Sequence, residues 1–194
     1  MDGTAIPVLS RIIELTNNKR RVVVAIDGRC ASGKTTLADA LSERLGCAVF
    51  HTDDFFLRPE QRTPERFAEP GGNMDRERLR DEVILPLERG EKTVVHRAYD
   101  CKTGTMTPPV ETKVGNVAIV EGSYSCHPDL RDHFDLRVFL TVSTEEQMRR
   151  ITAREGEAAA EVFGQKWIPL EEEYFKEYRI AERCDLCFST DVTK

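Results

Sequence analysis

The sequence has no long apolar run and no excess of basic charge. None of its hydrophobic stretches approaches the roughly twenty residues that a membrane-spanning helix needs, and 28 Lys and Arg residues stand against 34 Asp and Glu residues. The formal net charge of −6, without a basic block, argues against nucleic acid as the main partner. The N-terminus also lacks a basic start that leads into an apolar signal core. We therefore expect a cytoplasmic protein that acts on neither membranes nor nucleic acids.

A second pair of Cys or His residues is also missing near Cys184-x-x-Cys187. A structural zinc site normally needs such a pair, and a redox pair is expected at the start of a helix. This segment instead continues into Phe188 and Ser189 and has the character of a strand. We expect Cys184 and Cys187 to be packed strand residues without a metal or redox role, and the six cysteines of the chain to stay reduced.

The length of 194 residues and the hydrophobic content of 40% suit one domain with a real core. The chain has no internal repeat and no linker long enough to separate domains. We therefore predict a single domain over residues 1–194. Helices are expected over 5–18, 33–45, 75–87, 144–154 and 170–181, and strands over 22–26, 47–51, 92–96, 117–120, 136–142 and 184–189.

The most specific pattern in the chain is Gly28-x-x-x-x-Gly33-Lys34-Thr35, which is the P-loop pattern. It follows a β-branched run at 22–26 and precedes an apolar-periodic helix, the context in which this loop occurs. Its glycines let the backbone wrap around phosphates, its lysine reaches the β- and γ-phosphates, and its threonine can bind Mg²⁺. The pattern predicts binding of a nucleoside triphosphate, and a turn without a ligand is the alternative. The residues assigned to the nucleotide here are Gly28, Ala31, Ser32, Gly33, Lys34, Thr35 and Thr36.

Acidic residues follow two of the expected strands. In parallel α/β sheets, ligands bind outside the carboxyl ends of the strands, so these carboxylates should emerge beside the P-loop. Asp53 then suits a general base, although capping of a turn by Asp53 or Asp54 is the simpler alternative. Glu121 occupies the Walker B position, with Glu in place of the usual Asp, and suits a magnesium ligand; a solvent-exposed acid is its alternative.

Three segments are expected to surround this site. Residues 54–73 are rich in Pro, Gly and charge and form an acceptor loop, because loops of this length are usually functional. Residues 92–115 form a small β-hairpin excursion that turns near Gly104. Residues 149–166 form a lid in which Arg149, Arg150 and Arg154 clamp phosphates, although arginines here also fit a solvated helix face with neighbouring glutamates.

Several motifs together resemble those of the uridine kinase, phosphoribulokinase, pantothenate kinase and nicotinamide riboside kinase group of P-loop kinases. They are G-R-C-A-S-G-K-T-T, T-D-D-F-F, N-M-D and V-E-G, and the resemblance spans about residues 20–190. It implies that Asp53 is the catalytic base and that Lys34 and the lid arginines take part in catalysis. Uridine-cytidine kinases carry a His where this chain has Gly104. The acceptor-binding residues that the resemblance implies are Asp53, Phe56, Glu69, Tyr99 and Asp100.

We therefore expect a three-layer α/β P-loop NTPase fold with a central parallel sheet. The expected reaction is ATP- and Mg²⁺-dependent phosphorylation of a hydroxyl on a small nucleoside-like acceptor. A non-pyrimidine acceptor such as nicotinamide riboside or pantothenate is one alternative. A nucleotide-driven switch is another, although the guanine-reading N-K-x-D of GTPases is missing. The sequence leaves a homo-oligomer open.

Overall fold

The computed structural model describes residues 2–191 of the chain, and its centre is a five-stranded sheet. The strand order is β2-β7-β1-β8-β9, and every neighbouring pair is parallel. The expected α/β fold with a central parallel sheet is confirmed. The strands are β1 (Val22–Gly28), β2 (Ala48–His51), β7 (Val117–Glu121), β8 (Leu136–Thr141) and β9 (Leu186–Ser189).

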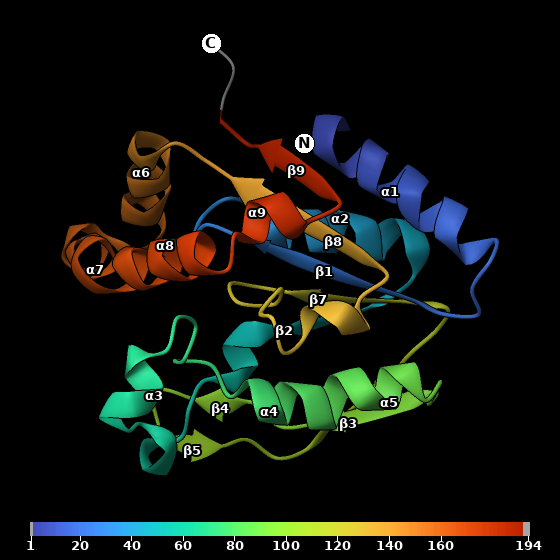
Figure 1. Cartoon of the computed structure of the whole chain (residues 1–194), viewed down its shortest axis with the longest axis horizontal. Helices are drawn as coiled ribbons and strands as arrows, with labels where there is room; N and C mark the ends of the chain where they lie inside the picture. The colour runs from blue at the N-terminus through green and yellow to red at the C-terminus, as the bar shows by residue number, and fades with distance from the viewer. Residues whose placement is uncertain (1, 192–194) are drawn as a thin grey trace.

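Helices cover both faces of the sheet, as Figure 1 shows, because successive residues of the buried strands point to opposite sides. Val22, Val24 and Ile26 of β1 join one hydrophobic cluster with α1 (Asp2–Thr16) and α2 (Lys34–Leu45). Val23 and Ala25 join the other cluster. Its helical segments include α4 (Arg76–Leu79), the π-helical η3 (Arg80–Ile84), α5 (Leu85–Glu88), α8 (Ile168–Glu177) and α9 (Ile180–Arg183).

Two expected helices are less regular than their sequence patterns suggest. The helix expected over 75–87 widens into η3 just before Pro86, which has no N–H to donate to the preceding turn. The helix expected over 170–181 is broken where Arg179 adopts a φ of 52°. In addition, Ser143 caps α6 (Thr144–Glu155) by accepting from Glu146 N, so the cap falls one residue before the Thr144 expected from the sequence.

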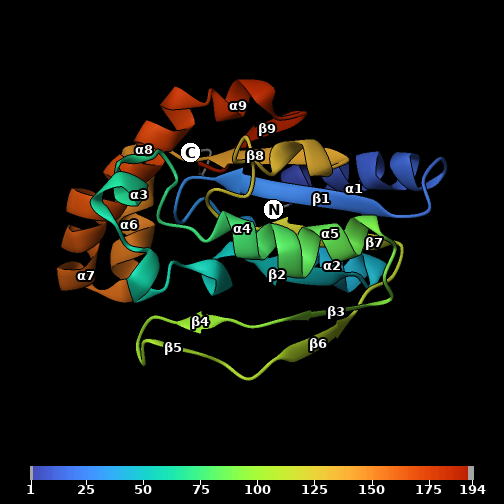
Figure 2. The same ribbon diagram turned by 60° about the horizontal axis from the view of Figure 1, so that its bottom comes forward.

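The expected hairpin excursion consists of two short antiparallel ribbons. β3 (Thr93–His96) pairs with β6 (Val110–Lys113), and β4 (Tyr99–Asp100) pairs with β5 (Thr105–Met106). Figure 2 shows these ribbons extending from the main body along the side of α4 and α5. Gly104 has a φ of +69° in the turn, a conformation that side-chain-bearing residues rarely adopt, so the turn accounts for this glycine.

Helical segments gather at the carboxyl ends of the strands. They are η1 (Thr52–Phe55), η2 (Pro59–Gln61) and α3 (Pro64–Ala68) on one side, with α6, α7 (Glu157–Val162) and the π-helical η5 (Phe163–Trp167) on the other. Both ribbon views place α3 and α6–α8 at this same end (Figures 1 and 2). The segments expected to be an acceptor loop and a lid thus contain several short helices. None of the described helices is long and apolar enough to cross a membrane.

The C-terminal cysteines do not form the packed pair that we expected. Cys187 is exposed, because along β9 Leu186 and Phe188 take the inward positions and Cys187 alternates with them. Cys184 precedes the strand and is half-buried, with its Sγ 3.9 Å from Sγ of Cys126. Within residues 2–191 no cluster of three or more His, Cys, Asp or Glu side chains could hold a metal ion.

Candidate active site

A cleft of about 960 Å³ opens where the carboxyl ends of the strands meet the P-loop. Its walls come from the P-loop, from the ends of β2 and β7, from the 56–74 segment and from the 150–171 segment. A second hollow of about 1050 Å³, lined among others by Lys19, Arg21 and Lys113, lies at the amino ends of the strands and contains no residue expected in the site. The first cleft is therefore the candidate active site.

The P-loop has the backbone that phosphate binding requires. Gly33 adopts a φ of +91° as the residue before α2, and no side chain caps that helix, so its first N–H groups are available to a ligand. Gly28 is needed for packing as well, because a Cβ there would lie 2.0 Å from Leu140 O of β8. Lys34 Nζ donates to Gly28 O (2.7 Å) and Arg29 O (2.9 Å), so the lysine lies folded against its own loop.

Asp27, which our sequence analysis did not single out, anchors the start of this loop. Its fully buried carboxylate accepts from Gly28 N (2.7 Å), Tyr124 N (3.2 Å), Cys126 N (2.9 Å) and Tyr174 Oη (2.8 Å). Burial raises the pKa of Asp27, while these donors oppose the rise. An acid within the run V-V-V-A-I-D was the available signal, because a charge in a buried strand needs partners.

Thr35 and Glu121 lie together, as expected of a magnesium site. Thr35 Oγ1 donates to Glu121 Oε1 (3.1 Å), and Glu121 is 4% exposed, which excludes the alternative of a solvent-exposed acid. His51 Nδ1 lies 2.6 Å from the same oxygen because the register of β2 and β7 pairs the two residues. The hydrogen bond to Glu121 raises the pKa of His51. This hydroxyl and carboxylate are the oxygen ligands that Mg²⁺ prefers.

Of the two neighbouring aspartates, Asp53 lines the cleft together with Lys34 and Glu121. Its side chain is exposed in the cleft, and desolvation by the surrounding protein atoms raises its pKa. The charge of Lys34 opposes the rise and that of Glu121 adds to it. Asp54 instead lies 3.8 Å from His96, outside the cleft lining. The geometry thus favours Asp53 for an acid–base role.

The structure separates the three lid arginines. Arg150 and Arg154 line the cleft, where Arg150 Nη1 donates to Ala31 O (3.1 Å) and Arg154 Nη2 lies 3.8 Å from Cys30 Sγ. Arg149 does not reach the cleft, and it forms a two-pronged ion pair with Glu146 (2.6 and 2.7 Å) on the solvated face. Arg149 thus lies apart from the other two lid arginines, because it projects from a different side of α6.

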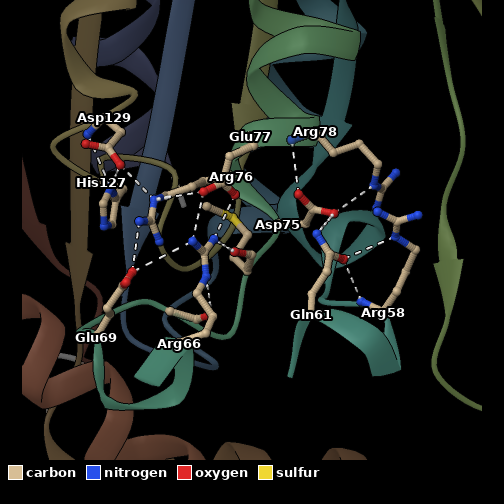
Figure 3. Close-up of polar contacts among 12 residues, drawn as sticks. Arg58, Gln61, Arg66, Glu69, Asp75, Arg76, Glu77, Arg78, His127 and Asp129 are labelled. Carbon is tan, nitrogen blue, oxygen red and sulfur yellow. Dashed lines mark hydrogen bonds and ion pairs between the residues drawn. The ribbon is translucent and has the colours of Figure 1, made fainter. Parts of the chain in front are cut away.

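The residues expected to bind the acceptor are only partly brought together. Phe56 lines the cleft, whereas Tyr99 is buried behind it under the guanidinium of Arg62. Glu69 lies outside the cleft lining and pairs with Arg76 (2.9 Å), as Figure 3 shows. Asp100 also lies outside it and accepts from Lys102 N (2.7 Å) in the hairpin turn. Glu69 and Asp100 thus lie outside the cleft lining, and each forms polar contacts within the protein.

Helix α8 adds a carboxylate that the sequence pattern did not reveal. Glu171 is buried, and it accepts from Cys30 N of the P-loop (2.9 Å) and from the hydroxyl of Ser123 (2.5 Å). Burial raises the pKa of Glu171, and the charge of Lys34 opposes the rise. The next residue, Glu172, pairs with Arg29 (2.7 Å). Two successive glutamates thus attach the helix after the lid to the P-loop.

Comparison with known families agrees with this geometry. The sequence profile of a family described as an AAA domain matches residues 24–164, most of the chain. The chain belongs to the AAA domain family. This AAA domain contains the P-loop, Asp53, Glu121 and the lid arginines.

Known relatives of this AAA domain include kinases. A bifunctional pantoate ligase/cytidylate kinase from Synechococcus is 26% identical, and the match covers 77% of this chain and 38% of that relative. A structure described as a possible uridine kinase from Bacillus stearothermophilus is 25% identical, covers 94% of this chain and 99% of its own, and has a TM-score of 0.64. D-glycerate 3-kinase from Cryptococcus neoformans shares the fold, with 18% identity, 88% and 87% coverage and a TM-score of 0.62. The expected relation to uridine kinase-like P-loop kinases is confirmed.

Proposed function

We propose that this chain transfers the γ-phosphoryl group of ATP to a hydroxyl of a small, nucleoside-like acceptor. The observation that carries the proposal is the position of Asp53, which shares one cleft with Lys34 of the P-loop and with the adjacent Thr35 and Glu121. A hydroxyl must lose its proton as it attacks phosphorus, and a nearby carboxylate can accept that proton. The relation to P-loop kinases supports the same class of reaction.

In this mechanism the chain positions the reactants and stabilises negative charge. Lys34 releases Gly28 O and Arg29 O and turns its ammonium group to the β- and γ-phosphates. Arg150 and Arg154 approach the same phosphates from the lid side of the cleft. Asp53 accepts the proton of the acceptor hydroxyl, and its raised pKa makes it a stronger base than an ordinary aspartate.

Thr35 and Glu121 are the residues that would hold Mg²⁺. When bound there, the ion neutralises charge on the phosphates of the donor. His51 shares the carboxylate of Glu121, so in its charged form it lowers the negative charge that Glu121 offers to a cation. Deprotonation of His51 therefore favours the metal.

The test is release of ADP from ATP and Mg²⁺ in the presence and absence of added acceptors. The panel contains uridine, cytidine, nicotinamide riboside, pantothenate and D-glycerate, and mass spectrometry identifies the phosphorylated product. We expect ADP release to depend on one of these acceptors and to match phosphorylated product one to one. Release at the same rate without any acceptor would instead support the alternative of a nucleotide-driven switch.

A second candidate acceptor is the phosphate of a nucleoside monophosphate, because a curated relative is a cytidylate kinase in part. A phosphate acceptor is already anionic and needs no general base, and the carboxylate of Asp53 would repel it. We therefore favour the hydroxyl acceptor. Formation of CDP from CMP, with little loss of rate when Asp53 is replaced by Asn, would favour the second candidate.

A further inference from the structure

Five arginines occur between residues 58 and 78, and they differ in whether they form an ion pair with an acidic side chain. Four of them have an acidic partner within ion-pair distance, and Figure 3 shows most of this network. These pairs are Arg58 with Glu60 (3.4 Å), Arg66 with Glu77 (2.8 Å), Arg76 with Glu69 (2.9 Å) and Asp129 (2.7 Å), and Arg78 with Asp75 (3.5 Å). Among the described residues, Arg62 alone in this segment forms no ion pair.

The guanidinium of Arg62 is nevertheless held in place. Its Nε donates to Leu57 O (3.0 Å), and its central carbon lies 5.6 Å from the ring centroid of Tyr99, within the range of a cation–π contact. Tyr99 is 5% exposed, so the ring beneath the guanidinium is fixed by the core. Nη1 and Nη2 of Arg62 form no hydrogen bond with the described protein atoms. These two nitrogens are therefore available to donate hydrogen bonds to a ligand.

Those surroundings are the cleft that contains Asp53. Arg62 lines this cleft together with Asp53 and Cys101. The lining of the same cleft also includes the apolar side chains of Phe56, Phe67 and Met74. The side chain of Arg62 is solvent-exposed in this cleft, so a ligand can reach its terminal nitrogens.

The phosphates of ATP do not require Arg62. The P-loop, Lys34, Arg150 and Arg154 already provide positive charge and N–H donors for them. Arg62 comes instead from the 56–74 segment, which supplies a separate part of the cleft wall. An anion beside Arg62 would therefore belong to the second substrate.

We propose that Arg62 binds an anionic group of the acceptor, so that the preferred acceptor is a hydroxyl compound with a carboxylate or phosphate. This inference rests on the proposed kinase function. A neutral nucleoside would leave the two terminal nitrogens of Arg62 without an anionic partner. Arg62 then acts as a specificity-determining residue that takes no part in the proton transfer at Asp53.

Matched acceptors test this proposal, each pair differing in one anionic group. The pairs are uridine and orotidine, glycerol and D-glycerate, and ribose and ribose 5-phosphate. We expect the wild-type protein to favour the anionic member of at least one pair by about 10- to 100-fold in kcat/KM, the range of a charge-assisted bidentate contact. The carboxylate and phosphate pairs distinguish the two kinds of anion.

Variants at Arg62 then separate a role in recognition from a structural role. Arg62→Gln should abolish the preference, mainly by raising KM for the anionic member with little change in kcat, and Arg62→Lys should restore part of it. Arg58→Gln is the matched control, because Arg58 carries the same charge in the same segment but lies outside the cleft lining. Circular dichroism and the thermal midpoint check that each variant is folded.

The outcomes distinguish this inference from the function on which it rests. If neutral acceptors are phosphorylated best and Arg62→Gln leaves the preference unchanged, Arg62 does not read an anion, whereas the kinase function stands. If no acceptor of either kind stimulates ADP release, the proposed kinase function itself fails, and the inference fails with it. An equal loss for both members of a pair in Arg62→Gln would show a merely structural role.

Discussion

His127, in the loop after β7, should make the protein lose stability in acid. Its side chain is 3% exposed, stacks against Tyr174 (centroids 6.2 Å apart, 7° between planes) and meets the edge of Tyr178 (5.1 Å). Nδ1 accepts from Asp129 N (3.2 Å), and Nε2 is buried with no hydrogen-bond partner among residues 2–191. Burial, followed by the nearby charge of Arg76, lowers the pKa of His127 from 6.5 to about 4.

The direction in which stability changes with pH follows from the linkage between protonation and folding. Between pH 6.5 and 4 the unfolded chain takes up a proton that the folded chain refuses, so stability falls as the pH falls. The difference in pKa corresponds to a loss of about 2 kcal/mol between roughly pH 7 and pH 4.5. This is a sizeable share of the stability of an ordinary domain.

Urea denaturation of the wild type and of His127→Asn, each at pH 7 and at pH 4.5, isolates the contribution of His127 to the loss of stability. The Oδ1 atom of Asn can still accept from Asp129 N, whereas Asn does not titrate in this range. We expect the variant to lose about 2 kcal/mol less than the wild type on acidification, although the missing ring packing lowers its stability at pH 7. Equal losses in the two proteins would refute the assignment of a buried neutral imidazole.

Three further predictions concern catalysis. Lys34→Ala should lower turnover by at least about 10²-fold while circular dichroism shows an intact fold, because it removes a charge from the phosphate site; near-normal turnover would contradict the kinase mechanism. The pH profile of kcat/KM should rise as Asp53 loses its proton, with a midpoint above the ordinary 3.8 of aspartate, and Asp54→Asn should leave this limb in place. Gly104, where uridine-cytidine kinases carry a pyrimidine-contacting His, should make uridine and cytidine poor acceptors, measured as kcat/KM against nicotinamide riboside; selective uridine phosphorylation would show otherwise.

The sequence was sufficient where function depends on neighbours along the chain. The P-loop spacing and the buried strand before it located Gly28 to Thr35, because one continuous turn makes that site. Asp53 and Glu121 could be placed beside it because parallel strands end at the same edge of the sheet. His51 was within reach of the same reasoning, since it ends the strand that neighbours Glu121 in the sheet.

Other parts of the site depend on how distant elements pack, which periodicity does not determine. Arg149 and Arg150 are adjacent in sequence, yet only the docking of α6 decides that Arg150 and Arg154, four residues apart, both reach the cleft. Glu171 contacts Cys30 across 141 residues of sequence. That Arg62 forms no ion pair among the described residues, unlike the other four arginines between residues 58 and 78, follows only from the three-dimensional structure.

The most direct test of the central claim compares acceptor-dependent turnover of the wild type with that of Asp53→Asn, with ATP affinity measured in parallel. Asn keeps the shape of the side chain but cannot accept the proton of a hydroxyl. Our account predicts a turnover lower by about 10²–10⁴-fold and an ATP affinity that is nearly unchanged. Full turnover in Asp53→Asn, with an acceptor that the wild type phosphorylates on a hydroxyl, would contradict the account.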